Sequence, residues 1–254
     1  MAMFDLAGGT ALVTGASRGI GRAVAIGFAE AGADVVAVSR SVDGMKGTAD
    51  AVAAAGRNCH VFAADISDVA SIEALFGEID AAGLRTDILL NNAGMEEVRP
   101  SVDVDESLWD RILDTNLKGA FFVASHFASR LLERGSQGSI INTCSLTSAI
   151  GVPTATPYTA SKSGMLGMTR ALSSEWSPRG IRVNGIGPGY FRTELTEAFY
   201  QDPAWQERML GKIPMGRFGE LEDLVGTCVY LASSASAYVT GQLVFVDGGY
   251  MASV

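Results

Sequence analysis

The 254-residue chain has few of the side chains that build many catalytic and structural sites. It contains three cysteines, Cys59, Cys144 and Cys228, and two histidines, His60 and His126. Apart from the adjacent Cys59 and His60, these residues are far apart in the sequence. Three scattered thiols favour free, buried cysteines over a disulfide framework or a thiolate catalyst. Two histidines offer no metal-ligand spacing. The sequence therefore predicts no metal site and no Ser-His-Asp triad.

Long apolar runs and clustered positive charge are also missing. No apolar stretch approaches the ~18 residues that span a bilayer, and the N-terminus lacks a basic region followed by an apolar core. We therefore expect a cytoplasmic protein with no membrane partner. The formal net charge of −9 argues against a nucleic acid partner, because phosphate binding needs clustered Lys and Arg.

The chain is rich instead in short apolar runs that alternate with helix-compatible segments. Apolar residues make up 48% of it, which fits a well-buried globular protein. The predicted strands are 11–13, 34–38, 59–63, 87–90, 138–143, 181–186 and 243–246, and the predicted helices are 22–30, 43–55, 69–82, 108–132, 158–176 and 221–232. This alternation predicts a parallel sheet with helices on both faces. Since no linker or repeat divides the chain, we predict a single doubly wound α/β domain over residues 1–254.

Residues 14–21, with the sequence TGASRGIG, connect the first strand to the first helix. Glycines at Gly15, Gly19 and Gly21 allow a tight turn and the close approach of a ligand to the backbone. The helix N-terminus adds exposed N–H groups and partial positive charge. Strand, glycine turn and helix in this order favour a dinucleotide site, with a plain tight turn as the alternative. We expect the partner to be a small-molecule substrate.

The end of the second predicted strand indicates which dinucleotide is bound. A carboxylate there would hold the 2′-hydroxyl of NAD, but the chain has Ser39 and Arg40. A guanidinium pairs with a 2′-phosphate, and Arg18 in the glycine turn offers a second cation. The sequence favours NADP, with NAD as the alternative.

A tyrosine and a lysine four residues apart stand where the pattern becomes helical. Tyr158 and Lys162 would share one helix face. An ammonium ~4 Å from a phenolate stabilises it by roughly 4 kcal/mol at an effective dielectric of about 20, so we expect Lys162 to lower the pKa of Tyr158. Ser145, at the end of a predicted strand, would hydrogen-bond the reacting oxygen. Asn116 interrupts a long helical segment, which indicates a kink or a bound water.

Residues 192–217 break the strand–helix rhythm. They follow a strand whose carboxyl end faces the ligand edge of a doubly wound sheet. We predict that this segment covers the substrate; a surface helix pair that only packs is the alternative.

Over nearly its whole length the chain resembles the short-chain dehydrogenase/reductases. The matching pieces are residues 14–21, Asn91-Asn92-Ala93-Gly94, Asn116, Ser145, Tyr158-Thr159-Ala160-Ser161-Lys162, Pro188-Gly189 and Val246-Asp247-Gly248-Gly249. Each piece is weak to moderate evidence, but together they occur in the family's order and spacing. The resemblance implies a Rossmann-like fold with a seven-stranded sheet, hydride transfer to or from NAD(P), and a homotetramer.

Carried over position by position, the resemblance implies that Tyr158 is the general acid/base, assisted by Lys162 and Ser145. It also implies that Asn116 anchors a water in a proton relay, and that Thr193 holds the nicotinamide carboxamide. The positions that would contact the cofactor are Gly15, Ser17, Arg18, Gly19, Ile20, Gly21, Ser39, Arg40, Asp65, Ile66, Asn92, Ala93, Gly94, Tyr158, Lys162, Pro188, Gly189, Phe191 and Thr193.

The stretches 187–196 and 213–219 resemble gluconate 5-dehydrogenases and related sugar-acid or polyol dehydrogenases. Arg192 or Arg217 would then pair with a sugar-acid carboxylate, and Glu96, Glu97 or Glu194 would bind hydroxyls, with surface charge as the alternative for each. A 3-oxoacyl carrier-protein reductase shares the motifs, although this acidic chain shows no basic patch for a carrier protein. A non-catalytic nucleotide-sensing protein is a third interpretation.

Overall fold

The computed structural model has all its named strands in one parallel sheet. The structure describes residues 2–192 and 199–253. The strands are β1 (Thr10–Thr14), β2 (Asp34–Ser39), β3 (Cys59–Ala63), β4 (Ile88–Asn91), β5 (Gly138–Thr143), β6 (Ile181–Pro188) and β7 (Leu243–Val246). Their order across the sheet is β3-β2-β1-β4-β5-β6-β7. The expected seven-stranded, doubly wound sheet is confirmed, and its order reverses between β1 and β4, where such sheets bind ligands.

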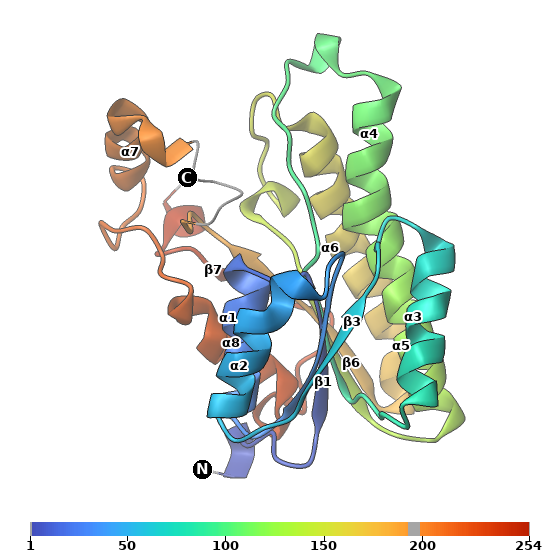
Figure 1. The fold of residues 1–254 in the computed structure, drawn as a ribbon. Helices are drawn as coiled ribbons and strands as arrows, with labels where there is room; N and C mark the ends of the chain where they lie inside the picture. Colours follow the sequence, from blue (N-terminus) through green and yellow to red (C-terminus); the bar gives the residue numbers. More distant parts are fainter. Residues whose placement is uncertain (1, 193–198, 254) are drawn as a thin grey trace.

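Helices cover both faces of this sheet (Figure 1). The α-helices of the described residues are α1 (Gly19–Glu30), α2 (Lys46–Ala54), α3 (Val69–Ala81), α4 (Glu106–Leu113), α5 (Ala120–Glu133), α6 (Thr156–Trp176), α7 (Pro203–Leu210) and α8 (Glu222–Ala232). Helices α1, α2 and α8 pack on one face, and α3, α5 and α6 pack on the other. Helix α7 stands apart from the sheet, near the C-terminus.

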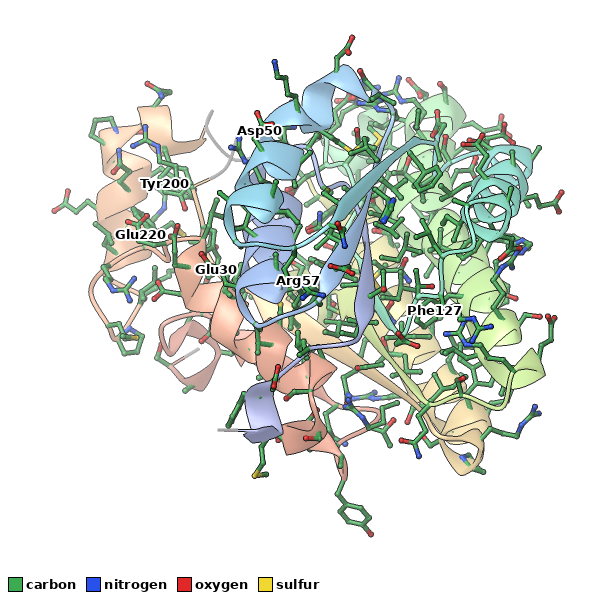
Figure 2. All side chains as sticks on the ribbon, turned by 60° about the horizontal axis from the view of Figure 1, so that its bottom comes forward. Glu30, Asp50, Arg57, Phe127, Tyr200 and Glu220 are labelled. Carbon is green, nitrogen blue, oxygen red and sulfur yellow. The ribbon has the colours of Figure 1, made fainter. Side chains whose placement is uncertain are left out.

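Alternate strand residues supply the two apolar layers, because successive side chains of a strand point to opposite faces. Leu12 and Leu89 pack with α3, α5 and α6, whereas Val13 and Leu90 pack with α1, α2 and α8. Phe127 of α5 is a large, fully buried side chain of the first layer (Figure 2). Strands that are buried on both faces have continuous apolar sequences. Their positions could therefore be predicted from the sequence.

The long helix expected over 108–132 is divided. Helix α4 leads into a π-helical turn, Asp114–Gly119, and α5 follows it. Asn116 lies in this turn, so the α-helical geometry is interrupted at the residue where a kink or a bound water was expected. A π turn replaces the i→i+4 ladder locally and is often found at functional sites.

Other predictions concern thiols, metals and membranes. The three cysteines are free thiols, and burial raises the pKa of Cys228 to about 12, so this thiol is not reactive. Among residues 2–192 and 199–253, no three His, Cys, Asp or Glu side chains are placed to hold a metal ion. In the part of the chain that the structure describes, no helix is both long enough and apolar enough to cross a membrane.

Candidate active site

A large cleft of about 960 Å³ lies at the carboxyl ends of the strands. This volume is at the upper end of the range for small-molecule sites. The predicted site residues that line it are Gly15, Ser17, Arg18, Gly19, Ile20, Ser39, Arg40, Asp65, Ile66, Asn92, Ala93, Gly94, Ser145, Tyr158, Lys162, Pro188, Gly189 and Phe191. Gly21 and Asn116 are buried and do not line the cleft. Thr193 and Glu194 lie outside the described residues.

The glycine turn leaves its backbone open to the cleft. Gly15 has φ +68°, and a Cβ on it would lie 2.9 Å from Nδ2 of Asn92, while a Cβ on Gly21 would overlap the carbonyl oxygen of Gly15. Nδ2 of Asn92 donates to the carbonyl oxygen of Thr14 at 3.2 Å, so it braces the turn. Helix α1 begins after Arg18 without a side-chain cap, so its first N–H groups are left for an anionic ligand. These features fit a dinucleotide pyrophosphate.

The outer end of the cleft carries the residues expected to select the dinucleotide. Ser39 and Arg40 line it, and the Ser39 hydroxyl donates to the carbonyl oxygen of Ser41 at 2.8 Å. The carboxylate of Asp65 accepts hydrogen bonds from the amide of Ser67 at 2.9 Å and from its hydroxyl at 2.7 Å. These bonds, with a smaller contribution from Arg40, lower the pKa of Asp65. Among the residues that line the cleft here, the end of β2 presents a guanidinium and no carboxylate.

Lys162 is fixed beneath Tyr158 on helix α6. Its ammonium lies 5.5 Å from the centroid of the Tyr158 ring and donates to the carbonyl oxygen of Thr143 at 2.7 Å. The side chain is only 3% exposed, and burial lowers its pKa to about 8. The ammonium is therefore held by one strand end and one helix, at the base of the cleft.

Ser145 is held just beyond β5, and Ser148 connects its turn to α6. The Ser145 hydroxyl accepts from the amide of Thr147 at 3.2 Å, and the Ser145 amide donates to the hydroxyl of Ser148 at 3.3 Å. The Ser148 hydroxyl in turn donates to the carbonyl oxygen of Lys162 at 2.8 Å. Sequence reasoning missed Ser148; its position three residues after Ser145, as in a capping box, was the available signal.

The expected lowering of the Tyr158 pKa is not produced by the protein's own groups. Burial, followed by the negative charge of Glu96, raises the pKa of Tyr158 well above its ordinary value, and hydrogen bonding to Ser145 only partly opposes this. This expectation was therefore wrong for the protein alone, because desolvation of the phenol is the largest cause of its pKa shift.

The side-chain amide of Asn116 hydrogen-bonds the backbone of the loop after β4. Its Nδ2 donates to the carbonyl oxygen of Met95 at 2.8 Å and to the Ser161 hydroxyl at 3.2 Å, and its Oδ1 accepts from the Met95 amide at 2.8 Å. The side chain is fully buried and its donors are all used. The expected relay water stays a prediction.

The other half of the cleft is lined by aromatic side chains that sequence reasoning did not single out. Tyr190 follows β6, and Tyr200 and Trp205 come from the segment predicted to cover the substrate. The rings of Tyr200 and Trp205 meet edge to face at 5.2 Å between centroids, and Trp205 stacks on Phe218 at 6.0 Å. Tyr200 lies beside α7, away from the sheet (Figure 2). These contacts attach the described part of the segment to the mouth of the cleft.

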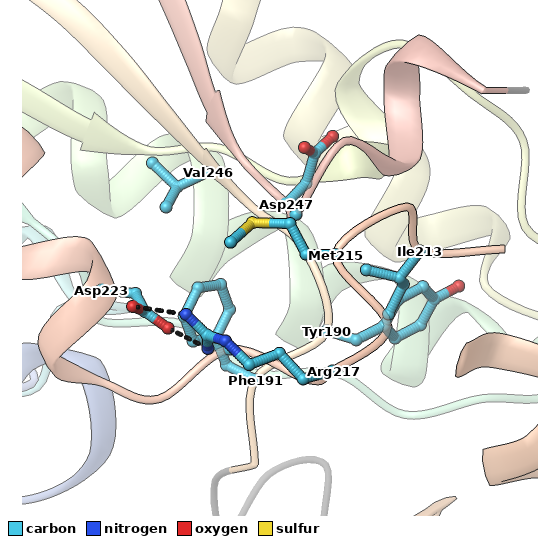
Figure 3. A pocket seen from close by; sticks show the side chains of 10 residues that line it. Tyr190, Phe191, Ile213, Met215, Arg217, Asp223, Val246 and Asp247 are labelled. Carbon is cyan, nitrogen blue, oxygen red and sulfur yellow. Dashed lines mark hydrogen bonds and ion pairs between the residues drawn. The ribbon is translucent and has the colours of Figure 1, made fainter. Parts of the chain in front are cut away.

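Two of the charged residues considered for substrate binding are engaged elsewhere. Arg217 forms a bidentate ion pair with Asp223, at 2.6 and 3.0 Å, beside a separate small cavity of about 190 Å³ (Figure 3). Glu97 pairs with Arg99 and with Arg111. Glu96, in contrast, lines the main cleft.

Comparison with known proteins agrees with this geometry. A family model described as enoyl-(acyl carrier protein) reductase matches residues 15–251. The chain belongs to the short-chain dehydrogenase/reductase family. The model's description names one activity within a broad family and does not by itself assign a substrate.

Individual members of the family that the chain resembles include sugar-acid dehydrogenases. Gluconate 5-dehydrogenase from Gluconobacter oxydans is 38% identical over 99% of this chain and 98% of the relative. A 2-dehydro-3-deoxy-D-gluconate 5-dehydrogenase from Pseudoalteromonas atlantica is 41% identical over 98% of each. The crystal structure of a gluconate 5-dehydrogenase from Burkholderia cenocepacia in complex with NADP and tartrate has a TM-score of 0.96, with 37% identity over 100% of this chain and 99% of that one.

Proposed function

We propose that this chain is an NADP-dependent oxidoreductase that interconverts a secondary alcohol and a ketone on a sugar acid or polyol. The observation that supports the proposal is that Tyr158, Lys162 and Ser145 line the same cleft as the glycine turn and the aromatic side chains. A hydroxyl-bearing carbon bound beside the aromatic side chains would share this cleft with Tyr158. The sugar-acid relatives support the substrate class.

The chain's own residues would bind the cofactor and move one proton. NADP, when bound, accepts or supplies the hydride. The glycine turn and α1 would hold the pyrophosphate, and Arg40 with Arg18 the 2′-phosphate. In alcohol oxidation, the Tyr158 phenol oxygen takes the proton of the substrate hydroxyl while the Ser145 hydroxyl holds that oxygen. Because burial and Glu96 raise the pKa of Tyr158 in the protein alone, its phenolate form would depend on the positive charge of Lys162 together with that of the oxidised nicotinamide.

The test is a substrate panel read by NADPH absorbance in both directions, with NADP and NAD compared. The panel contains gluconate, other sugar acids, neutral polyols, steroids and a 3-oxoacyl thioester. The proposal expects a sugar acid or polyol, with NADP, to give the highest kcat/KM. A preference for the thioester would instead support a carrier-protein reductase. No turnover combined with tight NADP binding would support a nucleotide-sensing protein.

We also propose a homotetramer, as the family resemblance implies. Trp109 of α4 and Phe121 of α5 are 40% and 39% exposed, and Tyr238 is fully exposed. Apolar side chains of this size on a surface are typical of subunit contacts. Light scattering during gel filtration tests the assembly: a mass of about 26.5 kDa would show a monomer and refute it. The predicted cytoplasmic location stays a prediction, which cell fractionation tests.

A further inference from the structure

Glu96 and Glu97 are adjacent in sequence but have different surroundings. Glu97 forms ion pairs with Arg99 and Arg111, the latter at 2.9 Å. Among the described residues, the carboxylate of Glu96 makes no hydrogen bond and no ion pair. Glu96 is half-buried and lines the main cleft. One of the two carboxylates is therefore occupied by the protein, and the other is left facing the cleft.

A carboxylate that is taken out of water without a partner is costly to keep. Burial raises the pKa of Glu96, and the charge of Lys162 acts in the opposite direction. The titratable groups within reach of its charge are Tyr158 and Lys162 of α6 and Tyr190 after β6, all of which line the same cleft. Cys144, at the end of β5, acts on the same two α6 residues. An unpaired acid in this position has the features of a functional group.

The backbone on either side of Glu96 is fixed. Both backbone atoms of Met95 are hydrogen-bonded to the Asn116 amide. The amide of Arg99 donates to the carbonyl oxygen of Thr154 at 2.8 Å, and Thr154 has φ +67°, a conformation that is uncommon outside glycine. This loop is therefore tied to the π turn on one side and to the loop before α6 on the other. A binding group needs such support to hold its geometry.

We propose that the Glu96 carboxylate accepts hydrogen bonds from substrate hydroxyls next to the reacting carbon and so determines which carbon faces Tyr158. This proposal rests on the proposed function and specifies the orientation in which the substrate binds in that site. An ionised carboxylate only accepts hydrogen bonds, and a polyol offers a donor on each neighbouring carbon. The same charge repels the substrate's own carboxylate. A six-carbon sugar acid would therefore enter with its acid end away from Glu96, which presents a distant carbon such as C5 for reaction.

The test compares two six-carbon ketones that differ only in hydroxyl groups. 5-Dehydrogluconate has hydroxyls on both sides of its ketone, and 5-oxohexanoate has the same chain, ketone and carboxylate without them. Both are reduced with NADPH by wild-type protein, Glu96→Gln and Glu97→Gln. We expect Glu96→Gln to lower kcat/KM for 5-dehydrogluconate by about 10- to 100-fold, the range for a hydrogen bond to a charged group. The value for 5-oxohexanoate should change less than about threefold, and Glu97→Gln should leave the ratio of the two unchanged.

A pH profile separates a direct contact from a general disturbance of the fold. The negative charge of Glu96 raises the pKa of Tyr158, so its removal lowers that pKa. Ketone reduction needs the protonated phenol, and the alkaline fall in kcat/KM should therefore begin at a lower pH in Glu96→Gln than in wild type. Glu97→Gln should keep the wild-type profile.

The outcomes distinguish this inference from the proposed function. If the wild-type protein does not reduce 5-dehydrogluconate, the sugar-acid assignment fails by itself, and the variants are compared on fructose and 2-hexanone, which are the neutral counterparts. Selective loss on fructose would then support the role of Glu96. An equal loss on both ketones of a pair, an equal loss in Glu97→Gln, or no reduction of any ketone overturns it.

Discussion

The side-chain amide of Asn116 holds the backbone of Met95 by two hydrogen bonds, each 2.8 Å long. One is donated by Nδ2 to the Met95 carbonyl oxygen, and the other is accepted by Oδ1 from the Met95 amide. This pairing joins the π turn between α4 and α5 to the loop that leaves β4. Glu96 follows immediately, so the position of a cleft residue depends on a residue that does not itself line the cleft.

Replacing Asn116 with alanine should destabilise the protein. The change removes a fully buried side chain and leaves the half-buried Met95 amide and carbonyl without these partners, so we expect a loss of about 2–4 kcal/mol in the free energy of unfolding. Urea denaturation measures it. Lys118→Ala, on the same turn, is the control, because its exposed ion pair with Asp114 contributes about 1 kcal/mol or less. Equal losses in the two variants would contradict the role of Asn116.

Tyr158→Phe should remove activity without removing the cofactor. The variant keeps the ring but lacks the phenol oxygen that moves the proton, so we expect kcat to fall about 10²- to 10⁴-fold. Calorimetry should show NADP binding within a few-fold of wild type. Tyr238→Phe, at a fully exposed position, is the matched control. Activity that survives in Tyr158→Phe would refute Tyr158 as the proton carrier.

Lys162→Met should stabilise the folded protein at neutral pH while it abolishes activity. Folding lowers the pKa of Lys162 from 10.5 to about 8, so at neutral pH the buried ammonium costs roughly 3 kcal/mol, less what its bond to the Thr143 carbonyl returns. Above both pKa values the cost is absent. It grows as the pH falls from 10.5 to 8, since the unfolded chain takes up the proton first, and it is constant below.

Unfolding midpoints of wild type and Lys162→Met measured across that range test the prediction. The variant should have the higher Tm at pH 7, and the difference should shrink as the pH rises from about 8 towards 10.5. A difference that does not depend on pH would show that the lysine is not the titrating group. Functional side chains that reduce stability are common at active sites.

Arg40→Ala should weaken selection for NADP. If Arg40 pairs with the 2′-phosphate, its loss should raise KM for NADP about tenfold or more and leave KM for NAD nearly unchanged. Arg85→Ala is the control, because Arg85 is exposed and precedes β4, at the opposite end of the sheet from the cleft. Equal Michaelis constants for NAD and NADP in the wild-type protein would already contradict the assignment.

Much of the fold was predictable because its signals are local. Strands such as β4 are buried on both faces and read as apolar runs, and helix α3 shows its buried face at regular spacing. The carboxyl ends of parallel strands converge, so residues that follow them were expected together. The cleft indeed gathers Gly15, Arg40 and Ser145 from three different strand ends.

The remaining features depend on contacts between distant segments. Nothing in the sequence distinguishes Glu96 from Glu97; what separates them is that Arg111 of α4 reaches one and not the other. Arg217 was a plausible anchor for a sugar-acid carboxylate until Asp223 was found to hold it. The pKa of Tyr158 depends on how deeply the folded protein buries the phenol, which spacing alone does not reveal.

The two halves of the cleft come from different kinds of structure, and this has an evolutionary consequence. The dinucleotide half is made by strand ends that cannot shift without disturbing the whole sheet, whereas Tyr200 and Trp205 belong to a segment outside the sheet and contact each other edge to face. Substitutions at exposed positions of that segment would leave the sheet and its strand ends unchanged. A duplicated gene of this kind could therefore diversify its metabolic role by exchanging one short stretch of chain while inheriting the rest unchanged.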